Sequence, residues 1–121
     1  MWALVQWLSQ GNLDGYHDML ENYAWSQAWD WGTPKHPPFF AWVVGAWFAV
    51  FPQTDWAYRL LSYTNVAVGL WGVLHLARRL GLGALAPTAA LLLLWSLPYA
   101  NLAAKFNANS QLLSLWPWTA A

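Results

Sequence analysis

Cysteine is absent from the 121 residues, and charged residues make up only 8% of them. The missing cysteine excludes disulfides and thiolate metal sites, and it says nothing about the compartment. A soluble domain carries about 25% charged residues because its surface faces water. With five basic and five acidic residues, this chain cannot cover such a surface. We therefore predict one small domain of an integral membrane protein.

Basic excess is also lacking, since the formal net charge is zero. Nucleic-acid binding needs clustered cations that neutralise phosphates, so we predict no nucleic-acid partner. The apolar start, Met1–Leu8, has no basic n-region and is too short for a signal peptide. We expect it to be the end of a transmembrane helix.

Apolar residues make up 59% of the chain, and their long runs predict an all-α fold of membrane helices. Residues 58–77 are long enough to cross a membrane. Arg78–Arg79 follows at once and predicts a cytoplasmic end. Residues 85–104 are expected to cross back with a kink at Pro98, and residues 112–121 begin another apolar run.

A shorter apolar segment, residues 39–52, ends at Pro52 after about 13 apolar residues. A span needs about 20 residues, so we expect this segment to dip into the membrane or lie along it. The outer loop at residues 9–38 and the polar stretch at residues 105–111 then lie on one non-cytoplasmic face. If the segment crosses instead, they lie on opposite faces. A tight turn is expected at Gly81–Gly83.

Most polar chemistry lies in the outer loop. Its residues 14–38 hold four of the five carboxylates, two of the three histidines and three tryptophans. Residues 18–29 are typical of a short amphipathic helix in the membrane interface, ended by residues 32–34. A charged residue near lipid is energetically costly and is usually retained because it has a function, so we expect the functional site in this loop. The alternative is a solvated loop with interfacial tryptophans.

Glu21 and Asp18 are the candidate catalytic carboxylates. Helical spacing places them on one face with Trp25. A carboxylate beside apolar aromatic surface is expected to have a raised pKa and to act as a general base toward a hydroxyl. The alternative is capping, with Asp18 as the N-cap and Glu21 in the capping-box position. We favour capping for Asp18 and leave both roles open for Glu21.

A divalent ion is the other possibility at this helix, because His17 and Glu21 are spaced i, i+4. Two ligands do not make a metal site, and a solvated histidine is the favoured reading. We therefore predict no metal and no cofactor, with a divalent cation as the open alternative.

Candidate substrate-binding residues flank the acids. Lys35 and His36 precede a rigid Pro-Pro corner at headgroup depth, where they suit a lipid phosphate or anchor the membrane flank. Trp25 suits stacking on a sugar or an isoprenoid, or plain interfacial anchoring. Arg59 lies near the outer start of its span, within reach of a phosphate or of the headgroups.

A second polar cluster, at the end of a span, is formed by Lys105, Asn107 and Asn109. These side chains suit hydrogen bonds to a substrate, with simple solvation as the alternative. His75, near the expected cytoplasmic end, is interpreted as structural.

The order of these motifs resembles the N-terminal part of the GT-C glycosyltransferases. An acidic cluster is followed by Lys35-His-Pro-Pro, then Phe39-Phe-Ala-Trp, then Val50-Phe-Pro-Gln-Thr-Asp-Trp-Ala-Tyr-Arg-Leu-Leu. The resemblance covers nearly the whole chain. It is to the bacterial family 39/83-like group, which includes the aminoarabinose transferases and the RgtA/B/C/D-like enzymes.

The resemblance implies a multi-pass enzyme of the bacterial inner membrane. Such an enzyme takes a sugar from a polyprenyl-phosphate donor and passes it, at the periplasmic face, to a lipid, polysaccharide or protein acceptor. The family's first-loop acid falls on Glu21, with Asp18 beside it. Its phosphate-gripping cation falls on Lys35 or His36, and the arginine of its Arg-Leu pair falls on Arg59.

Two positions depart from the family pattern. Members usually have adjacent acids where this chain has Glu21-Asn22, and often an aspartate where it has Asn107 and Asn109. Members are also several times longer, so we expect this chain to be a fragment that is inactive alone. The rival interpretations are a non-catalytic membrane subunit or transporter piece and, more distantly, a soluble binding module.

Overall fold

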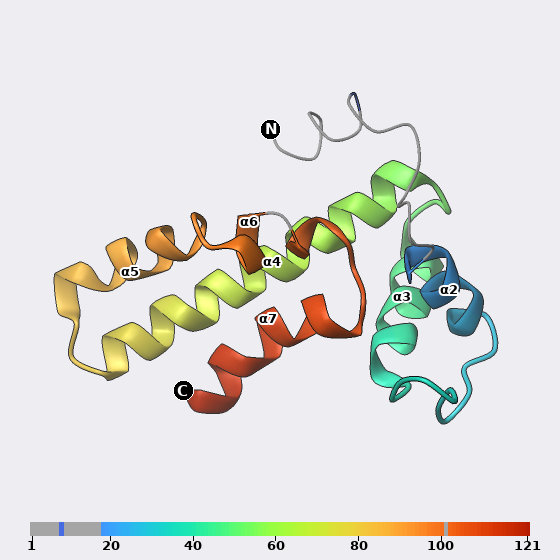
Figure 1. Ribbon diagram of the computed structural model, residues 1–121, viewed down its shortest axis with the longest axis horizontal. Helices are drawn as coiled ribbons and strands as arrows, with labels where there is room; N and C mark the ends of the chain where they lie inside the picture. The colour runs from blue at the N-terminus through green and yellow to red at the C-terminus, as the bar shows by residue number, and fades with distance from the viewer. Residues whose placement is uncertain (1–7, 9–17, 101) are drawn as a thin grey trace. The chain divides into compact units, whose positions relative to one another are not determined.

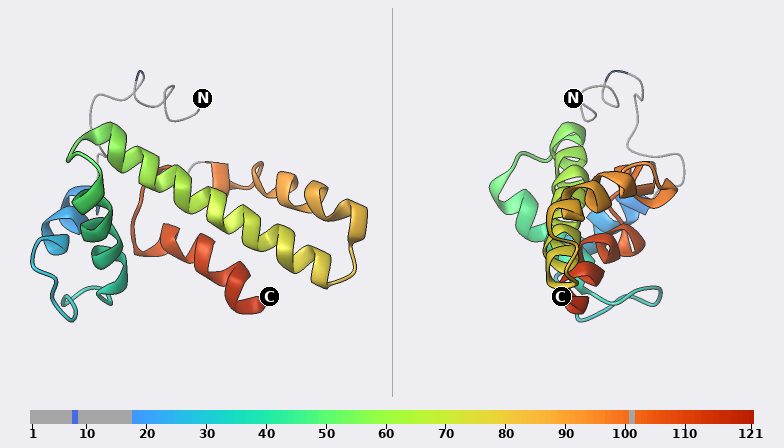
Figure 2. Two further views of the ribbon diagram at one scale, coloured as in Figure 1. Left: turned by 180° about the vertical axis from the view of Figure 1, so that it is seen from behind. Right: turned by 90° about the vertical axis from the view of Figure 1, so that its left-hand side faces the viewer.

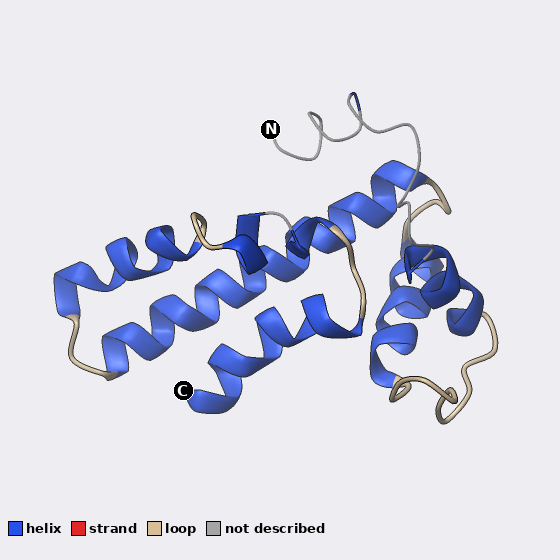
Figure 3. Cartoon of the chain, in the orientation of Figure 1, coloured by secondary structure: helices blue, strands red, loops and turns tan. Residues whose placement is uncertain are grey.

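The computed structural model of the protein describes residues 8, 18–100 and 102–121. Every regular element in these residues is a helix, and they contain no strand (Figure 3). The all-α prediction is confirmed. The chain forms two compact units, one of residues 1–61 with 105–108 and one of residues 62–104 with 109–121. Residues 1–7 of the predicted helix end, and residues 9–17 of the outer loop, lie outside the described residues.

The first unit contains α2 (Asp18–Ser26), α3 (Phe39–Val50) and the start of α4 (Asp55–Arg79) (Figure 1). Its core consists of apolar side chains from all three helices and one side chain from the later segment, residues 105–108. The buried members are Met19, Phe40, Val44, Tyr58, Leu61 and Phe106. Burial of these side chains from water or lipid fixes α2 against α3.

Helix α2 starts where the sequence predicts but ends at Ser26, three residues before the predicted Trp29. The Ser26 hydroxyl donates to the Tyr23 carbonyl at 2.6 Å. The next two N–H groups bond three residues back, which tightens the turn. Trp29 then adopts a φ of 52°, in the left-handed region that terminates helices. The predicted end at residues 32–34 is therefore wrong.

Prolines set both ends of α3. Pro38 precedes its first residue, and Phe51 follows its last with an extended backbone (φ −103°, ψ 153°). The residue before a proline is pushed toward that conformation, so Pro52 stops the helix. Twelve residues reach about 18 Å. That is short of the about 30 Å of a bilayer core, so the expected dip or interfacial position stays a prediction.

Helix α4 is long and apolar enough to cross a membrane, and no other helix in the described residues is. Its 25 residues extend about 37 Å. Asp55 lies in its first turn and Arg78–Arg79 in its last, which complements the helix dipole. The predicted tight turn follows: Gly81 has a φ of 83°, and the Leu82 N–H reaches back to the Ala77 carbonyl at 3.1 Å.

The second unit continues α4 and adds η1 (Gly83–Leu85), α5 (Ala86–Leu93), α6 (Leu97–Ala100), η2 (Leu102–Ala104) and α7 (Ala108–Ala120). The predicted helix over 85–104 is interrupted at Leu94–Ser96, before its expected kink. Pro98 lacks an N–H, and its ring excludes the carbonyl four residues earlier, at Leu94. Turn bonds to carbonyls three residues back replace the helical ladder there. Whether this region crosses a membrane stays a prediction.

Helix α7 lies along α4 in this unit, as Figures 1 and 2 show. The buried Asn65 amide donates to the Ser110 carbonyl at 2.7 Å and accepts from the Ser114 hydroxyl at 2.6 Å. At Gly69 the helices approach so closely that an added Cβ would lie 2.5 Å from the Leu113 carbonyl oxygen. Small residues and polar side chains of this kind hold helices together in membranes.

We predict that Gly69→Ala destabilises the second unit. Alanine favours a helix interior by about 1 kcal/mol over glycine, so an uncrowded site would gain stability. Here the methyl meets backbone, and overpacking of this kind costs about 1–3 kcal/mol. Unfolding in detergent measures the difference. Gly32→Ala, whose added Cβ meets nothing within 4 Å, is the control. A gain in stability for Gly69→Ala would contradict the packing described.

Candidate functional site

A turn organised by Thr33 presents Lys35 and His36, which precede the Pro-Pro corner. The Thr33 hydroxyl donates to the His36 carbonyl at 3.1 Å and accepts from the His36 N–H at 2.9 Å and the Lys35 N–H at 3.3 Å. The Thr33 N–H also donates to the His36 carbonyl at 3.1 Å. Threonine hydroxyls stabilise turns in this way. The sequence analysis gave Thr33 no role in the site, although a threonine directly before a proline is a recognisable turn signal.

Lys35 forms an ion pair with Glu21. Its Nζ donates to Glu21 Oε2 at 2.8 Å. This hydrogen bond raises the pKa of Lys35 above its usual value; desolvation opposes it, and the nearby charges of Glu21 and Asp18 add to the rise. Lys35 is therefore cationic at neutral pH. The side chains are 55% and 37% exposed, and such pairs contribute little to stability, so a charged ligand can replace either partner.

Three rings stand edge to face next to this pair. The Trp25 and His36 rings are 6.1 Å apart, and Phe40 lies 5.8 Å from Trp25 and 5.5 Å from His36. Trp25 comes from α2, His36 from the loop and Phe40 from α3. Edge-to-face packing stabilises aromatic pairs and fixes ring orientation. The half-buried His36 is thus held in place by its neighbours.

Four predicted site residues, Glu21, Trp25, Lys35 and His36, are thus brought together, and we refer to them as the loop cluster. Asp18 starts α2 and lies on the same helix face as Glu21. It lies in the first turn, where a carboxylate complements the helix dipole, and its capping role stays a prediction. The catalytic and binding roles of these residues stay predictions.

The other predicted binding residues are more scattered. Lys105 and Asn107 are half-buried in the first unit, on either side of Phe106. Asn109 is exposed at the start of α7 and belongs to the second unit, so the predicted polar cluster is divided. Arg59 is 2% exposed, inside the first unit. A phosphate contact by Arg59 stays a prediction.

Metal-ligand geometry is not found in the part of the chain that the structure describes. These residues hold no group of three or more histidine, cysteine, aspartate or glutamate side chains that converge. His17, which the sequence analysis considered with Glu21 as a possible metal ligand, lies outside the described residues. His75 stacks on Trp118 at 5.6 Å, in keeping with its structural interpretation.

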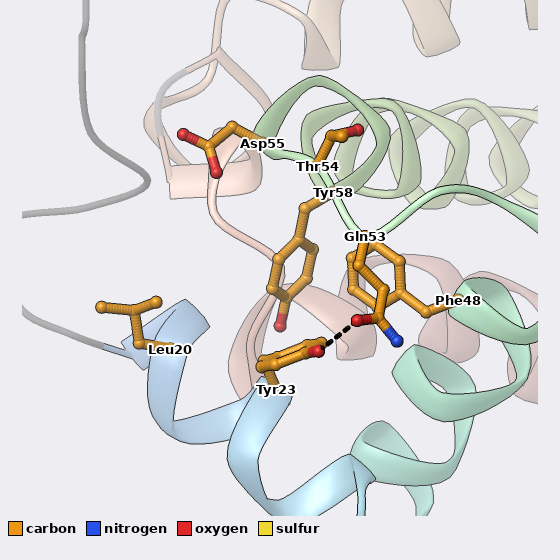
Figure 4. Close-up of a pocket in the computed structure, with 7 residues that line it drawn as sticks. All are labelled: Leu20, Tyr23, Phe48, Gln53, Thr54, Asp55 and Tyr58. Atoms are coloured by element: carbon orange, nitrogen blue, oxygen red, sulfur yellow. Dashed lines mark hydrogen bonds between the residues drawn. The ribbon is translucent and has the colours of Figure 1, made fainter.

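A second polar feature of the first unit was not predicted. Gln53 and Thr54, in the connection between α3 and α4, and Asp55, the first residue of α4, line a cavity of about 210 Å³ together with Tyr23 and residues of the adjacent helices (Figure 4). The signal in the sequence is a polar triplet between two apolar runs. The sequence analysis quoted the triplet as part of a motif but gave it no role.

Comparison with protein families identifies the chain. Residues 35–121 match the model of the family described as dolichyl-phosphate-mannose-protein mannosyltransferase. The chain belongs to this family. The family consists of membrane glycosyltransferases of the GT-C type, as the resemblance implied. No curated protein and no solved structure matches the chain.

The family match begins at Lys35 and includes α3, α4 and all later elements. Lys35 and His36 therefore belong to the matched region, whereas Asp18 and Glu21 precede it. The ion pair connects the matched region to the segment that precedes it, because it joins Glu21 of α2 to Lys35, the first matched residue.

Asn22 occupies the position where the resemblance expects a second acid. Its side chain is 1% exposed, and its Nδ2 donates to the Phe106 carbonyl at 3.4 Å. Its Oδ1 has no hydrogen-bond partner among the described residues. A carboxylate cannot donate a hydrogen bond, so the amide suits this contact with a backbone carbonyl. Asn22 thus fixes residues 105–108 beside α2, as expected if the two polar stretches meet.

We predict that Asn22→Asp lowers the free energy of unfolding by about 1–3 kcal/mol at neutral pH, because it leaves a buried acceptor facing a carbonyl. Burial raises the pKa of the new carboxyl above its unfolded value, so the loss is present above that pKa and is relieved as the pH falls below it. Unfolding in detergent across the acidic range measures this. Asn109→Asp adds the same charge at an exposed site and should cost little. Equal, pH-independent losses in both variants would contradict this role for Asn22.

Proposed function

We propose that the chain is part of a membrane glycosyltransferase that moves a sugar from a polyprenyl-phosphate donor to an acceptor at the periplasmic face of a bacterial inner membrane. The observation that carries the proposal is the Glu21–Lys35 pair. It places an acid and a cation 2.8 Å apart at the start of the family region. Sugar transfer from a lipid phosphate needs both charges, one to accept a proton and one to bind the phosphate.

In the proposed step, Glu21 accepts the proton of an acceptor hydroxyl. The hydroxyl oxygen forms a bond to the anomeric carbon of the sugar, and the bond from that carbon to the phosphate oxygen breaks. The lipid phosphate leaves with the electron pair, and Lys35 stabilises its negative charge. Asp18, one helical turn from Glu21, is the neighbouring acid.

The ion pair explains how both groups are ready before a donor arrives. Without a donor, each charge is matched by the other at a partly exposed site, which avoids an isolated charge near lipid. A donor phosphate competes with Glu21 for the Lys35 ammonium. When the phosphate binds, the Glu21 carboxylate is released toward the acceptor hydroxyl. His36, fixed by Trp25 and Phe40, is the second cationic candidate for the phosphate.

The family description supports a sugar linked to a lipid phosphate as the donor class. Dolichyl-phosphate mannose is therefore the first donor to test. Lys105 and Asn107, in the same unit as the loop cluster, are the proposed hydrogen-bonding partners for substrate hydroxyls. The product that forms in membranes will identify the acceptor class, which is a lipid, a polysaccharide or a protein.

We expect Glu21→Gln to lower transfer by about 10²–10⁴-fold, because the amide cannot accept the proton. Transfer of labelled sugar from the lipid donor is measured in membranes that contain the intact protein. Lys35→Gln should instead raise KM for the donor more than it lowers kcat, since its main loss is phosphate binding.

Asp30→Asn is the matched control, because it removes one exposed carboxylate of the same unit that lies outside the loop cluster. It should transfer sugar at the rate of the unmodified protein. Unchanged transfer in a folded Glu21→Gln variant would remove Glu21 from the mechanism. Absence of transfer from every lipid-phosphate donor, with all variants normally inserted, would favour a non-catalytic membrane subunit.

A further inference from the structure

The cavity between α2, the end of α3 and the start of α4 is chemically unlike the loop cluster. Figure 4 shows Tyr58 pointing from α4 toward Tyr23, with Gln53 beside them and Leu20 on the other side. The Tyr23 hydroxyl donates to Gln53 Oε1 at 2.8 Å. Phe48 stands edge to face with both tyrosines, at 5.5 Å and 5.3 Å. One wall is therefore aromatic and carries hydroxyl groups.

The polar part of the cavity is rich in neutral hydrogen-bonding groups. Gln53 offers an amide, and Thr54 and Tyr23 offer hydroxyls, whereas the buried Tyr58 contributes its ring to the wall. Asp55, exposed in the first turn of α4, adds a carboxylate that accepts bonds from two adjacent donors. Among the described residues, neither lysine nor arginine lines the cavity.

The size of the cavity limits what it can hold. An engineered cavity of about 150 Å³ is known to accommodate benzene. At about 210 Å³, this cavity has room for one six-membered ring with several small substituents. Pockets for drug-sized ligands are larger, at about 300–1,000 Å³. The volume thus fits one ring and is too small for an oligosaccharide or a long prenyl chain.

We propose that this cavity is a binding site for a single sugar ring. The amide, hydroxyl and carboxylate groups pair with adjacent sugar hydroxyls, and the aromatic wall packs against the C–H face of the ring. The site lies across α2 from the loop cluster, because Tyr23 and Glu21 are two positions apart and point to different sides of the helix. The proposal takes from the proposed function only that the protein meets sugars, and it does not require Glu21 to be the base.

Other occupants fit less well. A phosphate would meet the Asp55 carboxylate with no cation to offset the repulsion. A prenyl chain would leave the amide, the carboxylate and the hydroxyls without hydrogen bonds from the ligand, and covering polar groups in this way is costly. A sugar that carries an amine would pair with Asp55, and the test below includes one.

Binding is tested by saturation-transfer NMR on the detergent-solubilised protein, with methyl mannoside, methyl glucoside and methyl aminoglucoside as probes and inorganic phosphate as the comparison. We expect the glycosides to bind and phosphate not to bind. Asp55→Asn and Tyr23→Phe should each weaken glycoside binding by about tenfold, through loss of one sugar contact or of the Gln53 bond. Asp30→Asn, which removes a carboxylate outside the cavity, should bind like the unmodified protein.

Tyr23→Phe keeps the ring and its packing, so it tests the site even if Asp55→Asn disturbs the start of α4. The proposal is overturned if both variants, folded, bind the glycosides with unchanged affinity, or if phosphate binds in competition with the glycosides. Glu21→Gln separates this proposal from the proposed function. It should abolish transfer and leave glycoside binding intact, whereas loss of both would place the sugar at the loop cluster instead.

Discussion

Side-chain donors that bond to backbone carbonyls of other segments hold each of the two units together. In the first unit, the Trp47 indole N–H donates to the Ala57 carbonyl at 2.9 Å and links α3 to α4. Asn22 connects α2 to residues 105–108, and Asn65 connects α4 to α7 in the second unit. A membrane supplies no water to satisfy buried polar groups, so each must find a protein partner. With 8% charged residues, the chain relies on amides, indoles and hydroxyls for this.

The loop cluster depends on this framework. Residues 33–38 cannot form a helix, and the Thr33 hydroxyl satisfies their backbone while it aims Lys35 toward α2. The adjacent rings pack against His36, whereas the ion pair is partly exposed and can exchange partners. The backbone turn and the packed rings hold this site in place, and its exposed ion pair can be replaced. Such a site suits a ligand with a charged group.

Composition and periodicity were enough to predict the helices that have long apolar runs. The all-α class, the long apolar helix α4 and the turn at Gly81 follow from long apolar runs and glycine chemistry. The early end of α2 and the break at Leu94–Ser96 depend on local hydrogen bonds and on a left-handed Trp29, which no apolar pattern encodes. Likewise, Glu21 and Lys35 were identified as separate candidates, but their pairing needed the fold of the intervening loop.

Sidedness is the central claim, because the loop cluster acts as proposed only if it faces the non-cytoplasmic side, opposite the Arg78–Arg79 end of α4. The cysteine-free chain allows single cysteines at Gly32, where an added side chain meets nothing within 4 Å, and at Leu80, which is 71% exposed. With a membrane-impermeant maleimide, right-side-out vesicles should label only Gly32→Cys and inside-out vesicles only Leu80→Cys. Labelling of both from the same side would mean that α3 crosses the membrane, and would contradict the account.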